Sequence, residues 1–257
     1  MELDPKIKQF CDKKLQDLFS EKYWQKQIEK KEKIGNTDHL YTKEDARMAF
    51  VCHSVTIRNG QLIDELYTRA VKVCCPHLEV IKIGKKEFKI SPEAVTIAAT
   101  SQSDKNILGN NLPYGRAVKV KGKDKTAQID LLTYDRKEKI LSAYEIKRGG
   151  GQHDSGKQES IVQTFFQINF LLKSYGEKVK KLKVKKAKTY VISDMNRNLF
   201  SPEFKYFQVF GRDINKHFKS KTLRQNIDLA NKYFTESFRK GFLKIKKKAF
   251  ELLTNEL

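Results

Sequence analysis

The sequence is short of acidic residues for its size and has no long apolar run and few cysteines. Its 31 Asp and Glu face 52 Lys and Arg, which gives a formal net charge of +21. Such an imbalance makes a polyanion the expected partner, with nucleic acid ahead of a membrane surface. The alternative, that the excess of lysine only keeps the protein soluble, stays open because charge alone says nothing of fold or chemistry.

The missing features also bear on location. No apolar run reaches the ~18 residues of a membrane span, and the first residues, MELDPKIKQFCDKK, lack the apolar core of a secretory signal. The cysteines show no C-x-x-C spacing, and the adjacent Cys74 and Cys75 suit neither a zinc site nor an easy disulfide. We therefore expect no membrane partner, and reduced core cysteines in a cytoplasmic protein.

Apolar periodicity predicts the secondary structure, since no internal repeat or long linker divides the chain. The segment 91–100 fits either a short helix or a buried strand. The expected helices are 5–34, 43–54, 59–74, 158–175 and a mainly helical region from 212, with a long final stretch at 223–253. The expected strands are 78–84, 127–135, 139–147 and 187–194. This order predicts an α/β or α+β core with helices packed on its sheet.

Two carboxylates interrupt strands that would otherwise suit an apolar core. Glu145 and Lys147 end the segment 139–147. Side chains two positions apart in a strand share a face, whereas Ile146 points the other way. Asp130 stands between apolar neighbours in the preceding strand. A short polar turn between the strands predicts a hairpin, which would bring Asp130 close to Glu145.

A cation is the expected partner of these acids, because buried carboxylates are costly without compensation. Asp130, Glu145 and a main-chain carbonyl such as that of Ile146 would suit Mg²⁺, with water and phosphate oxygens in the remaining positions. Lys147 could orient or help deprotonate an attacking water, or neutralise charge at phosphorus. The pattern therefore indicates phosphodiester hydrolysis. The alternative is a structural salt bridge with Lys147 or Arg148.

Asp130, fourteen intervening residues and then Glu145-Ile146-Lys147 at a strand end resemble the motif of the PD-(D/E)XK nuclease superfamily. That superfamily includes most type II restriction endonucleases and many repair and recombination nucleases. The resemblance covers roughly residues 58–194. It implies a restriction-endonuclease-like fold, a mixed central sheet flanked by helices, with Mg²⁺ as the cofactor. Ile129 stands where the family name implies proline, a loss that many members tolerate.

The resemblance also implies a further acid from an earlier helix. RNGQLIDELY (58–67) looks like that element, with Glu65 at the matching position. At ~100° per residue, Glu65 lies about 60° round from Leu62, at the edge of the apolar stripe. It could equally be a surface acid that pairs with Arg69 four residues later. Asp64 is the alternative ligand.

Polar and basic residues around this core are candidate DNA contacts. The glycine-containing loop after Lys147 permits close backbone approach to DNA. Lysine-rich stretches at 178–188 and 239–248 would contribute affinity and salt dependence rather than sequence choice, with a solvated surface as the alternative. The recombination-type branch often carries Q-x-x-x-Y in the helix that follows the site, and this chain lacks the tyrosine. The predicted contacts are Arg116, Gln152, His153, Gln163, Gln167, Lys185 and Lys186.

The resemblance and the charge together lead us to expect a Mg²⁺-dependent endonuclease of double-stranded DNA, most like a type II restriction enzyme. A homodimer would match a palindromic site. The expected parts are an N-terminal helical region (1–57), a nuclease core (58–200) and a C-terminal helical region (201–257), packed together as one compact domain. Two alternatives stay open, namely a nucleic-acid-binding protein without catalysis and a repair or conflict-system nuclease with structure preference.

Overall fold

The computed structural model describes residues 2–20, 62–84, 86–100, 111–148, 155–200 and 207–254, together with single positions 22, 53 and 205. The chain divides into two compact units. The first combines Met1–Ala70 with Gln225–Leu257, and the second is Val71–Arg224. The three-part division expected from the sequence stays a prediction.

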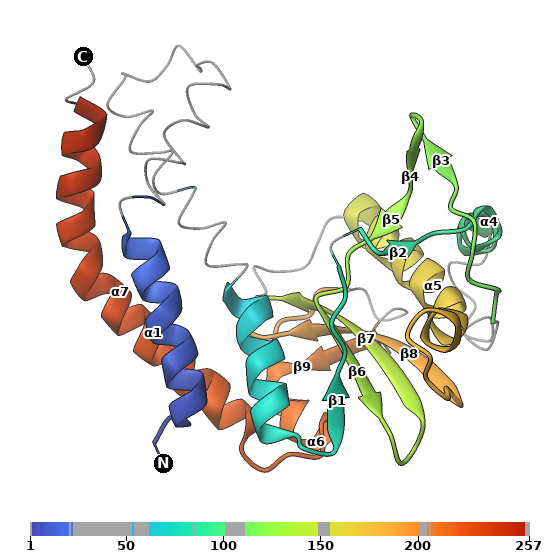
Figure 1. Ribbon diagram of the computed structural model, residues 1–257, viewed down its shortest axis with the longest axis horizontal. Helices are drawn as coiled ribbons and strands as arrows, with labels where there is room; N and C mark the ends of the chain where they lie inside the picture. The colour runs from blue at the N-terminus through green and yellow to red at the C-terminus, as the bar shows by residue number, and fades with distance from the viewer. Residues whose placement is uncertain are drawn as a thin grey trace. The chain divides into compact units, whose positions relative to one another are not determined.

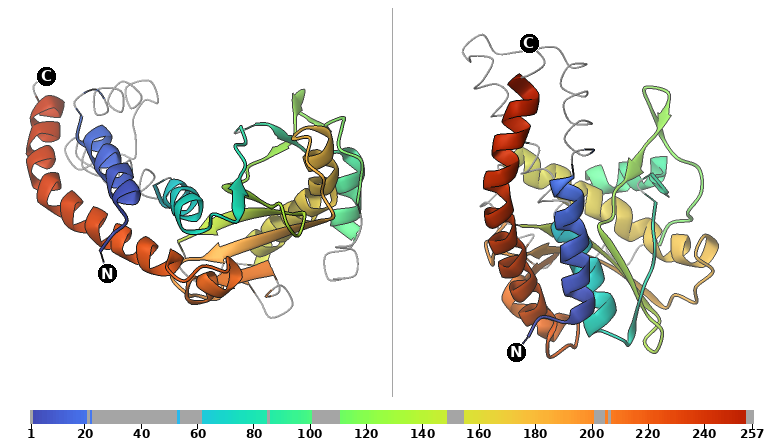
Figure 2. Two further views of the ribbon diagram at one scale, coloured as in Figure 1. Left: turned by 60° about the horizontal axis from the view of Figure 1, so that its bottom comes forward. Right: turned by 60° about the vertical axis from the view of Figure 1, so that its left-hand side comes forward.

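The first unit pairs two helices from opposite ends of the sequence, α1 (Pro5–Phe19) and α7 (Leu223–Thr254), which run side by side in Figures 1 and 2. Asp4 caps α1 by accepting hydrogen bonds from the main-chain N–H groups of Lys6 and Ile7. The ring of Phe19 stacks on that of Phe238, with centroids 6.1 Å apart. Contacts between helices, rather than helix propensity alone, stabilise this pair.

A mixed five-stranded sheet forms the centre of the second unit (Figure 1), in the order β1-β6-β7-β8-β9. The first three strands are antiparallel neighbours, whereas β8 and β9 continue the sheet in parallel. The strands are β1 (Leu78–Val80), β6 (Leu131–Asp135), β7 (Ile140–Lys147), β8 (Lys186–Ser193) and β9 (Gln208–Phe210). This arrangement confirms the predicted mixed sheet of an α/β protein.

Helix α5 (Ser155–Lys178) packs against β7 and β8 and buries one face of the sheet. Its aromatic side chains, such as Phe166, share the core with Leu141 of β7. Gly176 allows close approach, because a Cβ there would lie 2.6 Å from Leu141 Cδ2 and 2.8 Å from Val184 Cγ2. Helix α4 (Pro92–Thr100) packs on α5, with the Ser91 hydroxyl accepting a hydrogen bond from the Ala94 N–H.

Short strands extend the second unit beyond the main sheet. Strand β2 (Phe88–Lys89) pairs with β5 (Thr126–Ala127). Strands β3 (Lys119–Val120) and β4 (Lys123–Asp124) form a hairpin that projects away from the five-stranded sheet (Figure 1). After β9, the turn η3 (Gly211–Asp213) leads into α6 (Ile214–His217).

Several element boundaries differ from the prediction. The expected strand 127–135 is interrupted at 128–130, because Asp130 uses its side chain as well as its main chain to bind β7. The strand expected at 78–84 is limited to β1, and the ambiguous segment 91–100 is helical. Strand β9 was not expected. The helix expected at 43–54 lies outside the described residues, apart from residue 53.

Cys11 and Cys75 are buried thiols, whereas Cys74 is half-buried. Burial raises the pKa of the Cys11 thiol to about 11 and that of Cys75 to about 12, so both stay protonated near pH 7. Cys52 lies outside the described residues. No helix in the described part of the chain is long and apolar enough to cross a membrane.

Candidate active site

The hairpin of β6 and β7 sets the geometry of the predicted site. Its turn is held by Asp135, whose Oδ1 accepts hydrogen bonds from the N–H groups of Lys137 (3.0 Å) and Glu138 (2.9 Å). The strand register pairs Leu131 with Tyr144. Asp130 and Leu131 both lie opposite Tyr144, because the Asp130 N–H donates to the Tyr144 carbonyl oxygen.

Asp130 is bound to β7 through both its main chain and its carboxylate. Its N–H donates to the Tyr144 carbonyl oxygen at 3.0 Å, and its Oδ2 accepts from the Ile146 N–H at 2.9 Å. The side-chain amide of Gln128 donates to Oδ1 at 3.0 Å. The carboxylate is therefore fixed against the main chain between Glu145 and Lys147.

Glu145 and Lys147 form an ion pair on the face of β7 that α5 also covers. Their side chains are 22% and 36% exposed, so water and ions can reach the pair. Ile146 is buried and points to the opposite face. The structural salt-bridge alternative predicts the same pairing.

The main chain of β7 adds a third oxygen to this edge. The Lys147 carbonyl accepts from the Asp194 N–H of the β8 side, whereas the Tyr144 carbonyl accepts from Asp130 on the β6 side. Main-chain groups of successive strand residues point to alternate sides. Ile146 therefore turns both its N–H and its carbonyl oxygen toward Asp130.

These donors fit a hard divalent cation, because carboxylate and carbonyl oxygens are the ligands that Mg²⁺ prefers. Among the described residues, no group of three or more His, Cys, Asp or Glu side chains could hold a metal. Asp130, Glu145 and the Ile146 carbonyl stay the predicted ligands at this edge. Glu65 belongs to the first unit, where its carboxylate pairs with Lys14. Its part in metal binding stays a prediction.

Two contacts at the site were not predicted. The first is the hydrogen bond from Gln128 to Asp130. The two residues are two positions apart, like Glu145 and Lys147, so the same period of two could have placed their side chains on one face. Asp194 follows β8 and is 5% exposed, with Arg224 Nη1 2.8 Å from its Oδ1. A Cβ on Gly211 would lie 2.4 Å from the Asp194 carbonyl oxygen, so this tight contact requires glycine. We assign the Asp194–Arg224 pair a structural role.

The predicted DNA contacts are in different environments. Arg116, Lys185 and Lys186 are exposed, and Gln163 is half-buried. Gln167 is 3% exposed, which leaves little of it for DNA to contact, and its Oε1 has no hydrogen-bond partner among the described residues. Gln152 and His153 lie outside the described residues.

A mixed sheet whose central hairpin carries Asp130 and Glu145-x-Lys147 at one end is consistent with the PD-(D/E)XK nuclease class. The sequence model of one family, described as "Type II restriction endonuclease, HinfI", matches residues 3–253. The chain belongs to this family and is a restriction-type DNA endonuclease. Searches of curated proteins and of solved structures returned no match.

Proposed function

We propose that the protein is a Mg²⁺-dependent endonuclease that hydrolyses double-stranded DNA at a specific sequence. The observation that carries this proposal is the Asp130 carboxylate, held by the Ile146 N–H beside the Glu145–Lys147 pair. Family membership supports DNA as the substrate. The formal charge of +21 supports binding to a polyanion.

The side chains have distinct roles in the proposed reaction. Asp130, Glu145 and the Ile146 carbonyl would hold Mg²⁺, which would supply a Lewis acid to polarise the scissile phosphate and lower the pKa of water. Lys147 orients or helps deprotonate the attacking water, or neutralises charge that develops on phosphorus. Hydrogen bonds from Ile146 and from Gln128 fix the direction of the Asp130 carboxylate. Pre-orientation of this kind avoids reorganisation during the reaction.

DNA binding is proposed to use exposed cations and the predicted polar contacts. Arg116, Lys185 and Lys186 are exposed in the second unit and can contact phosphates. Gln152, His153, Gln163 and Gln167 remain proposed contacts, and Glu65 a proposed further metal ligand. A palindromic site would be read by a homodimer with one active site for each strand. We further propose that the protein acts in the cytoplasm.

Cleavage of a long, unmodified duplex DNA tests the proposal. With Mg²⁺, discrete fragments should form, and EDTA or Glu145→Gln should abolish them. The matched control is Glu138→Gln, which removes the same charge from the exposed hairpin turn and should cut normally. A smear would reject sequence specificity and favour the structure-directed alternative. Binding without cleavage on several DNAs, unaffected by EDTA, would favour the non-catalytic alternative.

A further inference from the structure

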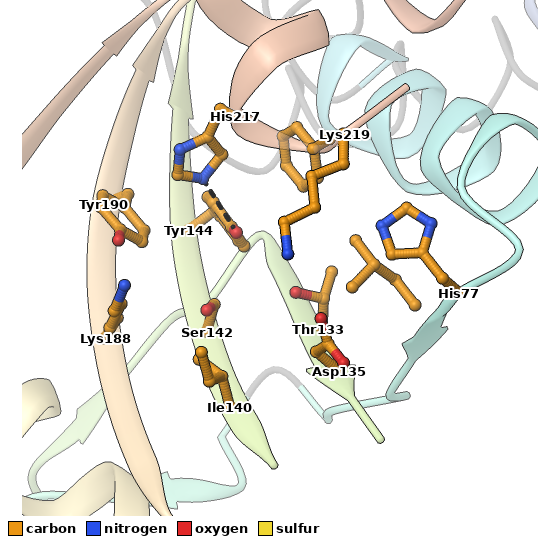
Figure 3. A pocket seen from close by; sticks show the side chains of 12 residues that line it. His77, Thr133, Asp135, Ile140, Ser142, Tyr144, Lys188, Tyr190, His217 and Lys219 are labelled. Carbon is orange, nitrogen blue, oxygen red and sulfur yellow. Dashed lines mark hydrogen bonds between the residues drawn. The ribbon is translucent and has the colours of Figure 1, made fainter. Parts of the chain in front are cut away.

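A pocket of about 180 Å³ lies on the face of the sheet opposite to α5 (Figure 3). Thr133, Ser142 and Tyr144 line it from β6 and β7. Lys188 reaches it from β8, and Lys219 from the segment after α6. All of these residues belong to the second unit, and none takes part in the proposed cleavage site.

The pocket carries an excess of positive charge. Within the described part of the chain, neither Lys188 nor Lys219 forms an ion pair. The lining includes the carboxylate of Asp135, but its Oδ1 already accepts hydrogen bonds from the N–H groups of Lys137 and Glu138. An anion that entered would meet two ammonium groups and one carboxylate, an excess of one positive charge.

His217 lies beside this charge and lines the same pocket. Its Nε2 lies 3.1 Å from the Tyr144 hydroxyl oxygen, and its ring meets that of Tyr190 edge to face, with centroids 4.6 Å apart. Burial, and after it the charge of Lys188, lowers the pKa of His217 to about 4. An anion beside Lys188 would offset part of that charge and raise the pKa of His217.

The size of the pocket limits its ligand. Pockets for drug-sized molecules usually measure ~300–1,000 Å³, and a water molecule occupies ~30 Å³ in the liquid. At about 180 Å³, this pocket exceeds the volume of several waters but is too small for most drug-sized ligands. The two lysines and the hydroxyls of Thr133 and Ser142 line one pocket and suit a small oxyanion, which accepts several charge-assisted hydrogen bonds.

Lys219 has a left-handed backbone conformation, which Lys121, Lys139 and Lys181 share. Its φ is +50°, a left-handed conformation at the end of α6 where glycine is the common residue. A side chain is unfavourable there, yet the ammonium group of Lys219 is directed into the pocket (Figure 3). Replacing Lys219 by glycine should remove the ammonium group without destabilising the fold, because glycine adopts this conformation readily.

We propose that this pocket binds a phosphate group, held by Lys188 and Lys219 together with Ser142 and Thr133. The phosphate comes either from a DNA backbone or from free inorganic phosphate. This site goes beyond the endonuclease proposal, because it requires neither a metal ion nor Glu145. Its test therefore uses the full-length protein with EDTA, so that its outcome does not depend on cleavage.

The first experiment titrates inorganic phosphate and follows the His217 imidazole resonance by NMR, assigned by its loss in His217→Gln. The resonance should shift in a saturable way, toward a higher pKa, in the wild type. Lys188→Met and Lys219→Gly should each weaken phosphate binding at least tenfold. No saturable shift in the wild type would overturn the proposal.

Lys181→Gly is the matched control for Lys219→Gly. Lys181 is exposed, has a φ of +56° and lies outside the pocket lining. Both variants lose one positive charge and relieve one left-handed side chain, so both should raise the melting temperature. Only Lys219→Gly should lose phosphate binding. Equal phosphate affinity in the two variants would overturn the proposal.

A second titration, with short duplex DNA in EDTA, identifies the source of the phosphate. If DNA shifts the His217 resonance and inorganic phosphate competes, the ligand is a backbone phosphate. If inorganic phosphate alone produces the shift, the pocket binds the free ion. Both outcomes support the site, whereas a shift with DNA that persists unchanged in Lys188→Met and Lys219→Gly would contradict it.

Discussion

Alternate side chains of strand β7 lie on two different faces of the sheet. On the face covered by α5, Leu141 is fully buried, and the same row of side chains ends in the ion pair of Glu145 and Lys147. On the other face, Ser142 and Tyr144 line the pocket that carries the lysines. One strand thus presents an apolar core and the proposed cleavage site on one side, and a polar pocket on the other.

This comparison shows how strongly both sites depend on strand register. A slip of one residue would move Glu145 to the pocket face and Ile146 to the cleavage face, since side chains alternate along a strand. Register is fixed at one end by the Asp135 hydrogen bonds of the turn. At the other end, it is fixed by the contact between Asp130 and the Ile146 N–H.

The largest expected effect concerns only the face of β7 that carries the Glu145–Lys147 pair. Lys147→Ala removes the cation paired with Glu145 and should lower the single-turnover cleavage rate by about 10²–10⁴-fold, the usual contribution of a positioned acid or base. DNA affinity should change by less than tenfold. Lys137→Ala, in the exposed turn of the same hairpin, is the control and should cleave at the wild-type rate. Equal rates in the two variants would refute the role of Lys147.

A second effect belongs to the pocket face and depends on pH. Burial, followed by the charge of Lys188, lowers the pKa of His217 to about 4 in the folded protein. The unfolded chain, with a histidine pKa near 6.5, binds the proton first, so stability should fall as pH drops from about 6.5 to about 4. The loss should be at most about 3 kcal/mol.

Urea unfolding of the wild type and His217→Gln over this pH range measures that contribution. The difference in the free energy of unfolding between the two proteins should change with pH mainly between 6.5 and 4. Lys188→Met should reduce the pH dependence, because it removes a charge that opposes protonation of His217. A difference that stays constant with pH would show that His217 is not held neutral.

A smaller effect concerns packing on the α5 face. Gly176→Ala would place a Cβ 2.6 Å from Leu141 Cδ2, and overpacking of a core costs about 1–3 kcal/mol. The gain in helix propensity offsets up to about 1 kcal/mol of that cost. Gly115→Ala is the control, since no atom lies within 4 Å of its Cβ. Thermal unfolding should show a lower melting temperature for Gly176→Ala than for Gly115→Ala, and the reverse order would contradict the close packing.

The smallest expected effect involves Gln128, which supports Asp130 without belonging to the motif. Gln128→Ala removes the hydrogen bond to Asp130 Oδ1, and loss of such a supporting contact typically costs about 10–100-fold in metal affinity or activity. Because Gln128 is exposed and Ile146 still holds Oδ2, we expect the lower end of that range. Half-maximal cleavage should therefore need a higher Mg²⁺ concentration, and the rate should recover at saturating Mg²⁺. A rate loss that Mg²⁺ does not recover would exclude this role.

The sequence predicted the features that depend on local periodicity. A period of two predicted that Glu145 and Lys147 share a face, and the polar turn predicted the hairpin that pairs β6 with β7. It did not predict that the strand stops at 128–130, because that depends on the Asp130 side chain binding the Ile146 N–H. A propensity scale does not include such a competing hydrogen bond.

The pocket could not be predicted from the sequence, because His77, Thr133, Lys188 and Lys219 are far apart along the chain and share no local pattern. Each looks like an ordinary polar residue in a lysine-rich protein. Strand β9 has only three residues, too few for a period of two to stand out. Its pairing with β8 is a long-range contact that only the fold reveals.

Direct metal binding tests the central claim, that Asp130 and Glu145 form a divalent metal site. Calorimetric titration of Mn²⁺ into the wild type should show a saturable site, which Asp130→Asn and Glu145→Gln lose and Glu138→Gln retains. This result would establish the two carboxylates as metal ligands independently of any DNA sequence. Equal Mn²⁺ binding by all four proteins would contradict the claim and identify Glu145–Lys147 as a structural ion pair.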